Sequence, residues 1–518
     1  AFCGIFLTSA LFRLTALKAA RSFHRKLLST VLRLPMTFFD TTPLGRVLNR
    51  FSKDIYTIDE VLQNILYSYL QVVSVVVCTM IVISAATPWF LVVIFPLLLV
   101  YRATQNFYIP ASRQLKRIES NLRSPIFSHF SETLDGTALI RAFGQQQIFI
   151  SENMGKVSKN MRAYYSNFSS NRWLAVRLES FGAGITFCAG TLAVVGRHQI
   201  SAGVAGLSIS YALSITQALN WVVRMAADRE TSIVSVERVR EYLRLELEPP
   251  HHCENDPAPN SWPTSGSIEF QNVFLRYRPE LPTVLNGLSL EIRSREKIGI
   301  CGRTGAGKSS VLNLLLRIVE AESGCVKVDG LDIKTLGLHR LRHSITVIPQ
   351  DPVLFSGTLR FNLDPLNEAA DGGQYWQALQ RSHLSDHVAR LERENAEDEG
   401  GRSNGLEVFV QEQGKNFSLG QRQQMCLARA LMRSNLILLL DEATSAVDRE
   451  TDDLIQQTIK EEFADHTVLC IAHRISTIMN SDRVCVLDAG KLAEIGAPAD
   501  LMQAKDSRFA QLAALDAA

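Results

Sequence analysis

Long apolar runs alternate with charged segments in the first half of the chain. Residues 61 to 101 hold two such runs separated by a Thr-Pro pair, and residues 178 to 195 and 204 to 223 hold two more around a polar turn. Runs of this length predict membrane-spanning helices, and the short interruptions predict tight turns between them. Together with the apolar run at residues 2 to 17, the pattern predicts five spans.

The charged segments between these runs predict an orientation. Residues 18 to 60 and 102 to 177 are rich in Lys and Arg, whereas the two tight turns hold no basic residues other than Arg197 and His198. Because Lys and Arg favour the cytoplasmic side of a membrane, the long segments are predicted to be cytoplasmic and the N-terminus to be outside. Their helical periodicity predicts that the membrane helices extend well into the cytosol.

A cap residue, a Pro and a Gly at residues 40 to 51 predict a short helix that crosses between two long ones. Such a helix offers a surface that can press on another domain. The alternative is a solvated amphipathic turn.

Composition divides the chain near residue 248. Apolar residues make up 46% of the sequence and charged residues 20%, a balance between those of a soluble enzyme and a membrane protein. Residues 1 to 248 carry a net charge of +11 and the remainder −9, which gives the overall +2. A basic half can bind anions or face lipid, and its apolar runs favour lipid over nucleic acid. We therefore predict a transmembrane domain at residues 1–248, a Pro-, Asn- and Ser-rich linker at 249–265 and a soluble domain at 266–518.

Cysteine and histidine usage adds little chemistry. The nine cysteines include no CxxC pair, so buried thiols in a reducing compartment are expected rather than zinc ligands or disulfides. His251, His252 and Cys253 suggest a metal, but no further ligands stand at a recognised spacing. The acidic stretch at residues 391 to 401 is expected to be a solvated loop. The chain begins at Ala1 without a signal-like segment, so we expect it to be part of a longer protein.

The soluble half contains a phosphate-binding motif. The strand-like KIGICG runs into Gly302-Arg-Thr-Gly-Ala-Gly-Lys308-Ser309, which is followed by a helical pattern. This GxxxxGK[ST] sequence lies between a strand and a helix, as a P-loop requires. Its glycines let backbone N–H groups converge on phosphate, Lys308 offers a charge to the β and γ oxygens, and Ser309 can ligate Mg²⁺. The predicted nucleotide-binding residues of this loop are Gly302, Thr304, Gly305, Ala306, Gly307, Lys308, Ser309 and Ser310.

Two further segments support ATP chemistry. Residues 436 to 442 read as a buried strand that ends in Asp441, which can hold Mg²⁺, and Glu442, which can orient or deprotonate the attacking water. Residues 417 to 421, FSLGQ, open a helical stretch and present N–H groups and a positive helix end to an anion. For the first segment the alternative is an ordinary strand-to-helix junction, and for the second it is a helix cap alone.

The order of these motifs resembles that of one large family. GRTGAGKSS, IPQDPVLFSGT, FSLGQRQQ, LLLDEATSAVD and IAHR are similar to the nucleotide-binding domain of ABC transporters, in the form found in the multidrug-resistance-associated subfamily. The similarity extends through TPLGRVLNRFSKD, NRWLAVRLE, SAGVAGLSISYAL, NWVVRM and SIVSVERVREY. It implies an all-α transmembrane bundle of the ABC exporter type, followed by an α/β P-loop NTPase domain with a helical subdomain. TPLGRVLNR would then be a coupling helix.

The resemblance assigns roles to further residues. It implies that Tyr277 stacks on adenine, that Gln350 senses γ-phosphate and Mg²⁺, and that His473 contacts γ-phosphate. Asp448 resembles the D-loop aspartate, and Ser418, Gly420 and Gln421 belong to the signature that closes over nucleotide. The implied catalytic set is Glu442, His473, Lys308 and Gln350, and the implied Mg²⁺ ligands are Ser309, Gln350 and Asp441.

Two details place the chain within the family. Glu442 stands where the first nucleotide domain of these exporters usually has Asp, so the chain resembles the C-terminal half with the second, hydrolytically competent domain. The signature departs from LSGGQ at Phe417 and Leu419. The resemblance implies that Lys308 and Glu442 hydrolyse ATP opposite the signature of an N-terminal half, while FSLGQ closes the weaker site.

A cargo class follows from charges in the apolar runs. Arg172, Arg177 and Arg224 lie in or near predicted spans, where a charged side chain usually faces a cavity or a partner. Trp221 lies on the same helical face as Arg224, and an aromatic beside a cation suits an amphipathic anion such as a glutathione or glucuronide conjugate. The alternative is that the arginines snorkel to the interface or pair with Glu179 and Asp228.

The resulting hypothesis is an ATP-driven exporter of organic anions, with ATP and Mg²⁺ as cofactors. Its partners would be the lipid bilayer, the N-terminal half of the same transporter and a small organic anion, with no nucleic acid. It would reside in the plasma membrane, or in a vacuolar or other internal membrane, with its nucleotide domain in the cytosol. Two other hypotheses remain open, a channel gated by the same ATP cycle and a regulatory subunit that binds nucleotide without pumping.

Overall fold

The computed structural model of the chain forms two units. The structure describes residues 2–86, 88–196, 201–258, 261–367, 372–399, 405–441, 449–472, 474–504 and 506–516. The first unit comprises Ala1–Arg33 with Thr42–Leu245, and the second comprises Leu34–Thr41 with Glu246–Ala518. Residues 34–41 therefore group with the C-terminal part of the chain, although they lie near its start.

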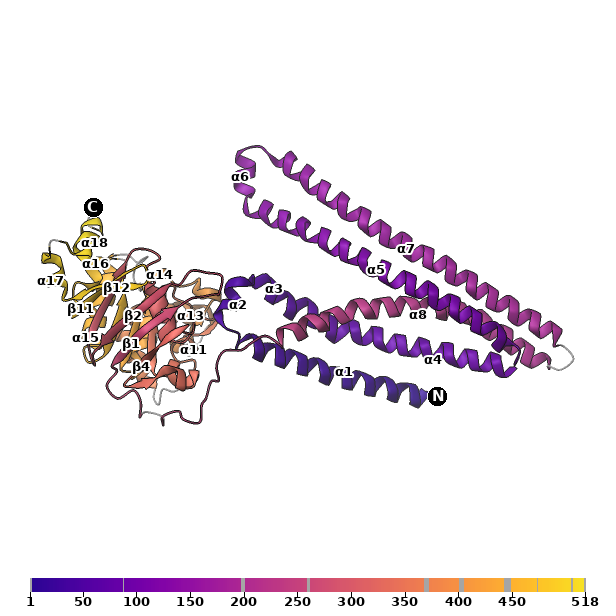
Figure 1. The fold of residues 1–518 in the computed structure, drawn as a ribbon, viewed down its shortest axis with the longest axis horizontal. Helices are drawn as coiled ribbons and strands as arrows, with labels where there is room; N and C mark the ends of the chain where they lie inside the picture. Colours follow the sequence, from indigo (N-terminus) through magenta and orange to yellow (C-terminus); the bar gives the residue numbers. More distant parts are fainter. Residues whose placement is uncertain are drawn as a thin grey trace. The chain divides into compact units, whose positions relative to one another are not determined.

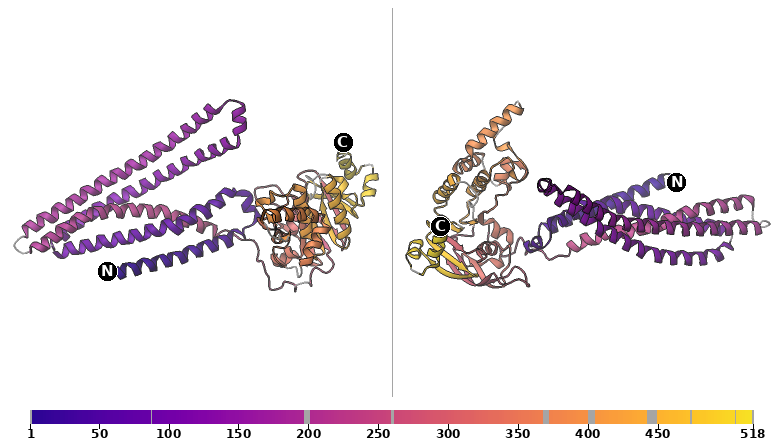
Figure 2. Two further views of the ribbon diagram at one scale, coloured as in Figure 1. Left: turned by 180° about the vertical axis from the view of Figure 1, so that it is seen from behind. Right: turned by 90° about the horizontal axis from the view of Figure 1, so that it is seen from above.

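The first unit is built from long helices (Figure 1). They are α1 (Phe2–Val31), α4 (Leu62–Ala86), α5 (Phe90–Asp135), α7 (Gln146–Val195) and α8 (Ala202–Tyr242). Helices α5 and α7 run side by side and are joined at one end by the short α6 (Thr137–Ala142), as Figures 1 and 2 show. Helix α8 packs against both α4 and α7. Small apolar clusters hold the helices together, one of them around Phe90, Ile185 and Ile215.

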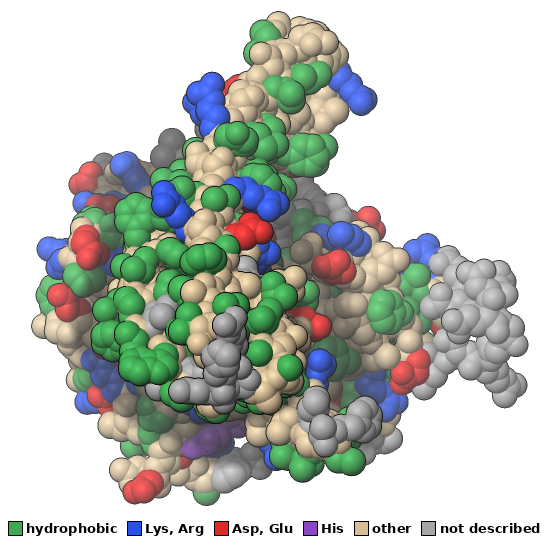
Figure 3. Space-filling view, turned by 90° about the vertical axis from the view of Figure 1, so that its right-hand side faces the viewer, with side chains coloured by type: hydrophobic (Ala, Val, Ile, Leu, Met, Phe, Trp, Pro, Cys, Tyr) green, Lys and Arg blue, Asp and Glu red, His purple; other side chains and the backbone are tan. Residues whose placement is uncertain are grey.

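Three of the described helices are long and apolar enough to cross a membrane, judged by length and composition. They span Leu44–Ala85, Gln146–Val195 and Ala202–Tyr242. In Figure 3, hydrophobic side chains gather over the ends of the long helices that face the viewer. The other two predicted spans, near residues 2–17 and 89–101, fall within α1 and α5, and the count of five spans stays a prediction.

Helix α5 is 46 residues long and carries three prolines inside it, Pro96, Pro110 and Pro125. A proline has no N–H to donate to the carbonyl four residues earlier, and its ring crowds that carbonyl. The helix nevertheless continues through all three positions, with α7 packed beside it.

The segment at residues 40–51 contains the short helix expected there, and a second short helix precedes it. Two helices occupy this part of the chain, α2 (Met36–Thr41) and α3 (Leu44–Asn49), and π-helical turns at Arg50–Asp54 and Thr57–Val61 lead into α4. The break falls just before Pro43, because a proline disfavours helical backbone in the residue that precedes it. Helix α2 is grouped with the second unit and α3 with the first, and the coupling role expected of residues 42–50 stays a prediction.

Two sheets form the core of the second unit. The antiparallel sheet has the order β2-β1-β4-β5, and the larger sheet has the order β12-β11-β3-β10-β9-β6 with only β12 antiparallel. The strands of the first are β1 (Ile268–Leu275), β2 (Leu285–Ile292), β4 (Ser323–Val328) and β5 (Leu331–Asp332). Those of the second are β3 (Lys297–Gly302), β6 (Ile345–Ile348), β9 (Ile437–Asp441), β10 (Thr467–Ile471), β11 (Arg483–Asp488) and β12 (Lys491–Gly496). A third, two-stranded sheet pairs β7 (Gly357–Thr358) with β8 (Phe409–Val410).

Helices surround the sheets and also form a subdomain of their own. Those beside the sheets are α9 (Lys308–Leu315), α10 (Leu338–His343), α15 (Arg449–Glu462), α16 (Ile475–Ile478), α17 (Pro498–Gln503) and α18 (Arg508–Asp516). A separate apolar cluster joins α11 (Leu359–Leu363), α12 (Gly372–Arg381), α13 (Ser385–Glu399) and α14 (Leu419–Leu431). The predicted fold class, a helical membrane region followed by an α/β domain with a helical subdomain, is confirmed.

The acidic stretch at residues 391–401 was expected to be a loop, and that expectation is wrong for residues 391–399. They form the C-terminal part of α13. Their sequence, LERENAEDE, is dominated by Glu, which favours helix, and this propensity outweighs the cost of clustered charge.

Candidate nucleotide-binding site

The P-loop connects the end of β3 to the start of α9. Gly302, Gly305 and Gly307 adopt φ angles of 152°, 84° and 98°, which side chains rarely allow. A Cβ atom at Gly302 would lie 2.3 Å from the carbonyl oxygen of Leu487. A Cβ atom at Gly305 would meet no atom within 4 Å, so this part of the loop borders open space. The glycine spacing thus permits both close packing on β11 and an accessible backbone.

Lys308 and the neighbouring turn hold the loop closed. The Nζ atom of Lys308 donates a hydrogen bond of 3.0 Å to the carbonyl oxygen of Gly302, and the residue is only 6% exposed. The Gly490 N–H, in the turn between β11 and β12, donates to the Ala306 carbonyl at 3.2 Å. The loop therefore encloses the ammonium group of Lys308, and this cation is already in position to bind a phosphate oxygen.

Ser309 and Asp441 meet across the end of the sheet. The Ser309 hydroxyl lies 3.5 Å from Asp441 Oδ1. Asp441 is placed there by β9, whose preceding four residues are buried. A hydroxyl and a carboxylate are the hard oxygen ligands that Mg²⁺ prefers, so this pair fits the predicted ion. Burial, reinforced by the charge of Asp441, raises the pKa of the adjacent Cys470 thiol to about 12.

Tyr277 and Ser310 contact each other. The Tyr277 hydroxyl lies 2.9 Å from the Ser310 Oγ, and Asn313 donates to the Tyr277 hydroxyl at 3.4 Å. The tyrosine is thereby fixed against the first turns of α9, at the P-loop. Ser310 is buried and engaged by this contact, whereas Thr304 and Ser309 are exposed. The roles of these residues toward nucleotide stay predictions.

Gln350 lies just after β6 and is exposed. The carbonyl of its neighbour Pro349 accepts a hydrogen bond of 3.2 Å from Gln423 Nε2, in the buried part of α14. This bond connects the segment that carries Gln350 to the signature helix. Sequence reasoning missed Gln423, because nothing in the sequence shows that a glutamine inside a helix points inward.

The signature residues begin α14 through a reciprocal cap. The Ser418 hydroxyl accepts a hydrogen bond from the Gln421 N–H, and the Gln421 side chain accepts one from the Ser418 N–H. Gly420 lies between them in the first turn. Phe417 is buried in the helical subdomain, with its ring 5.5 Å from that of His387. The cap that was weighed as an alternative is therefore present, and it holds the backbone N–H groups of this turn in place.

Three predicted residues, Glu442, Asp448 and His473, lie outside the described residues. The two strands that lead to them, β9 and β10, are adjacent and parallel, with Asp441 opposite Ile471.

The predicted cargo residues lie on two helices of the first unit. Arg172 and Arg177 lie on α7, and Trp221 and Arg224 lie on α8. The Arg224 guanidinium carbon is 5.5 Å from the centre of the Trp221 ring. Asp228, weighed as a partner for these arginines, instead pairs with Lys116 of α5 at 2.9 Å.

The two arginines of α7 also lie beside aromatic rings. Arg177 lies 5.5 Å from the ring of Trp173, and that ring is 5.7 Å from Phe107 on α5. Arg172 lies 5.0 Å from Phe168. Each of the three arginines thus lies beside an aromatic residue that is three or four positions earlier on the same helix. Trp173 was not among the predicted cargo residues, although its spacing of four from Arg177 in a helix was the available signal.

The fold and the loop define a class of protein, a P-loop nucleotide-binding domain joined to a helical membrane region. Two family patterns match the chain, that of the ABC transporter transmembrane region over residues 1–219 and that of the ABC transporter over residues 285–445. The chain belongs to the ABC transporter family. The predicted resemblance and nucleotide binding are thereby confirmed at the level of the family.

Curated relatives place the chain in sub-family C. It is 50% identical over 489 residues to ATP-binding cassette sub-family C member 3 of Mus musculus, and 48% identical over 501 residues to member 2 of the same species. It is also 46% identical over 507 residues to the metal resistance protein YCF1 of Saccharomyces cerevisiae. These alignments cover 94%, 96% and 98% of this chain but 31%, 32% and 33% of the relatives. The chain spans about a third of the length of the curated relatives it matches.

Proposed function

We propose that this chain is the C-terminal half of an ATP-driven exporter of amphipathic organic anions, such as glutathione, glucuronide or sulfate conjugates and drugs. The observation that carries the proposal is the joint position of Lys308, Ser309 and Asp441 around a P-loop, in a chain of sub-family C. The N-terminal half would supply a second transmembrane domain and a second nucleotide domain.

Different residues of this chain would act on different parts of the bound ATP. Lys308 exchanges its bond to the Gly302 carbonyl for phosphate oxygens, which are stronger acceptors. Ser309 and Asp441 would hold Mg²⁺, which neutralises charge on the phosphates when bound. Glu442 orients or deprotonates water, while Gln350 and His473 respond to the γ-phosphate. Tyr277 packs on adenine from its position beside Ser310.

The arginine–aromatic pairs support the choice of cargo. Cations set against the rings of Trp221 and Trp173 offer a conjugate both a counter-charge and an apolar surface. Both rings are substantially exposed in the described structure, so they are accessible to a ligand.

The test uses the full-length protein in sealed membrane vesicles. ATP-dependent uptake of a labelled glutathione conjugate is measured for the wild type, Glu442→Gln, Arg224→Ala and Arg162→Ala, the last being an exposed arginine on α7 outside the pairs. We expect Glu442→Gln to abolish uptake, Arg224→Ala to weaken uptake of anions selectively and Arg162→Ala to behave as wild type. ATP hydrolysis without uptake of any conjugate would contradict the cargo, and a conductance that only dissipates gradients would indicate a channel.

A further inference from the structure

Helix α1 has two sides with different surroundings. Ala20, Leu27 and Val31 are at most 7% exposed, and at about 100° per residue they lie within about 40° of one another around the helix. Their burial marks the side that packs within the first unit, where α1 contacts α4 and α8. Six exposed side chains lie together on the other side, and they belong to Leu7, Leu11, Leu14, Lys18, Arg21 and Arg25.

These six residues, here called the α1 stripe, change in character along the helix. Their spacing alternates between four and three, which aligns them along one side. The leucines come first and are 54–58% exposed, and the three cations follow. At about 1.5 Å per residue, the cations occupy about 10 Å of the helix directly after the leucines. A change from apolar to cationic side chains along one side of a helix matches the boundary between acyl chains and headgroups in a bilayer.

The cations of the α1 stripe lack a counter-charge in the described part of the chain. Helix α1 contains no Asp or Glu, and none of the three cations forms an ion pair there. The turn at Thr57–Val61 contacts α1 and contributes Asp59 and Glu60, but both are exposed and neither pairs with these cations. By contrast, Arg113 of α5 pairs with Glu230 of α8 at 2.8 Å. A helix packed on the stripe would bury three unpaired cations, which is costly, whereas a layer of anionic groups neutralises them.

We propose that the α1 stripe binds an anionic phospholipid of the cytoplasmic leaflet. Leu11 and Leu14 contact its acyl chains, and Lys18, Arg21 and Arg25 contact its phosphate and other anionic headgroup oxygens. The transmembrane-region pattern covers residues 1–219, so α1 belongs to the membrane part of the chain. The predicted orientation puts its basic end on the cytoplasmic side, where the leaflet is negatively charged. The proposal does not depend on the proposed cargo or on the ATP site.

The test uses the full-length protein in nanodiscs of phosphatidylcholine with a minor share of phosphatidylserine. A photoreactive benzoylphenylalanine replaces Ser22, which is exposed and lies one helical turn from both Lys18 and Arg25. Illumination joins this residue to whatever covers the stripe, and mass spectrometry identifies the product. We expect phospholipid adducts in which phosphatidylserine is enriched about fivefold over its share of the bilayer.

Variants of the stripe test the role of its charges. The triple variant Lys18→Gln, Arg21→Gln and Arg25→Gln should reduce the phosphatidylserine share of the adducts to its share of the bilayer. The triple variant Lys18→Arg, Arg21→Lys and Arg25→Lys keeps the charges and should keep the enrichment. Added salt should lower the enrichment in the wild type, because it screens the cations.

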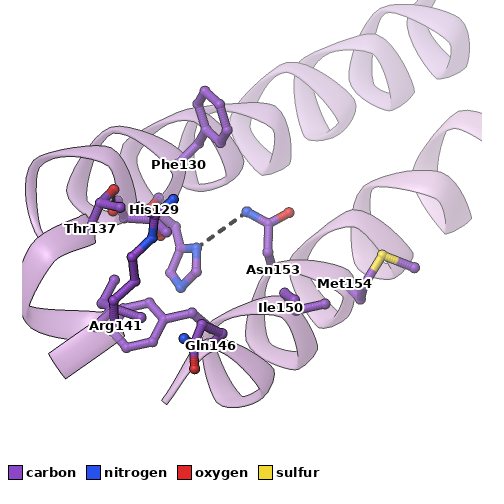
Figure 4. Close-up of a pocket in the computed structure, with 11 residues that line it drawn as sticks. His129, Phe130, Thr137, Arg141, Gln146, Ile150, Asn153 and Met154 are labelled. Carbon is purple, nitrogen blue, oxygen red and sulfur yellow. Dashed lines mark hydrogen bonds between the residues drawn. The ribbon is translucent and has the colours of Figure 1, made fainter. Parts of the chain in front are cut away.

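A matched control removes three exposed cations from α6 and α7, through Arg141→Gln, Lys159→Gln and Arg162→Gln. Figure 4 shows the tip of the α5–α7 hairpin, where Arg141 lines a hollow and His129 Nδ1 lies 3.2 Å from Asn153 Nδ2. This control has the same net charge as the glutamine variant of the stripe, and it should keep the enrichment. ATP binding by each variant reports whether the protein is folded.

Three results would overturn the proposal. One is a phosphatidylserine share in the wild-type adducts that equals its share of the bilayer. Another is an undiminished enrichment in the glutamine variant of the stripe. The third is a photoproduct that joins α1 to the N-terminal half of the protein instead of to lipid, because the stripe would then be a contact between helices.

Discussion

Strand β9 and helix α4 have similar apolar side chains but opposite surroundings. Residues 437–440 of β9 are buried between neighbouring strands and helices, whereas the apolar window of the candidate span Leu44–Ala85 is only 6% buried. In β9 the protein itself supplies the apolar environment, and the packing fixes the position of Asp441. In α4 the outward-facing apolar side chains have no such cover from the described part of the chain. Hydrophobicity alone therefore does not indicate whether a residue stabilises the fold by packing or by solvation.

The two units also contain charged side chains with different kinds of partner. Asp329 in the second unit accepts hydrogen bonds from the N–H groups of Thr264, Ser265, Gly266 and Ser267. In the first unit, the pairs Arg113–Glu230 and Lys116–Asp228 join α5 to α8 through partly exposed side chains. Backbone N–H groups in fixed positions therefore bind Asp329, whereas the ion pairs between α5 and α8 join two flexible side chains.

Core truncation should give the largest difference between the units. Leu439→Ala removes a fully buried side chain from β9 and should lower the free energy of unfolding by about 2–5 kcal/mol. Ile81→Ala alters a side chain of α4 that is 62% exposed and should change it by less than about 0.5 kcal/mol. Chemical denaturation of the purified protein in nanodiscs measures both. Equal losses would show that the protein also covers the outer face of α4.

Asp329→Ala should cost about 2 kcal/mol, because four backbone donors lose their acceptor. Burial opposes ionisation of this carboxyl, but the hydroxyl of Ser265 and the backbone N–H groups hold its pKa well below the usual range. The stabilisation is therefore complete above the unfolded pKa of about 4 and is lost as the pH falls from there toward the folded pKa. Unfolding measured from pH 7 to pH 3 should decline less steeply for Asp329→Asn than for the wild type. Parallel curves would contradict the assignment.

Ser418→Ala removes half of the reciprocal cap of α14 and should destabilise the second unit by about 1 kcal/mol. Ser418→Asn keeps a capping acceptor and serves as the matched control. If the side chain also contacts nucleotide across a partner domain, ATP turnover of the full-length protein should fall in both variants, while stability falls only in the first.

The ion pairs of the first unit should give the smallest effect. Lys116→Met and Asp228→Asn, made singly and together, should show a coupling energy of at most about 1 kcal/mol, because both groups are about one-third exposed. A double-mutant cycle of thermal unfolding measures it, and the coupling should decrease with added salt. A larger coupling would place this pair in a low-dielectric environment.

Local patterns in the sequence were sufficient to predict the P-loop and the long helices. Gly302, Lys308 and Ser309 lie within one stretch of eight residues, so their geometry follows from one strand, one turn and one helix. Ser309 and Asp441 were each predicted to ligate Mg²⁺ from their motifs, which implies that the two residues lie close together. Features that depend on distant contacts were not predictable in this way. The bond from Gln423 to Pro349 and the meeting of His129 with Asn153 depend on how separate elements pack.

One local prediction was wrong for a different reason. The acidic residues 391–399 were assigned to a loop because charge was weighed above helix propensity. A local rule, helix propensity, was available there, and a competing one was given too much weight.

The three prolines of α5 also have a geometric consequence. Pro110 follows Pro96 by 14 residues, and Pro125 follows Pro110 by 15. At about 100° per residue, these steps differ from four full turns by only about −40° and +60°, so the three prolines lie on one side of the helix. The missing hydrogen bonds are therefore concentrated along a single edge. A helix that lacks hydrogen bonds along one side bends most easily in the plane that contains that side. We therefore expect α5 to bend in one preferred plane, at three positions along its length.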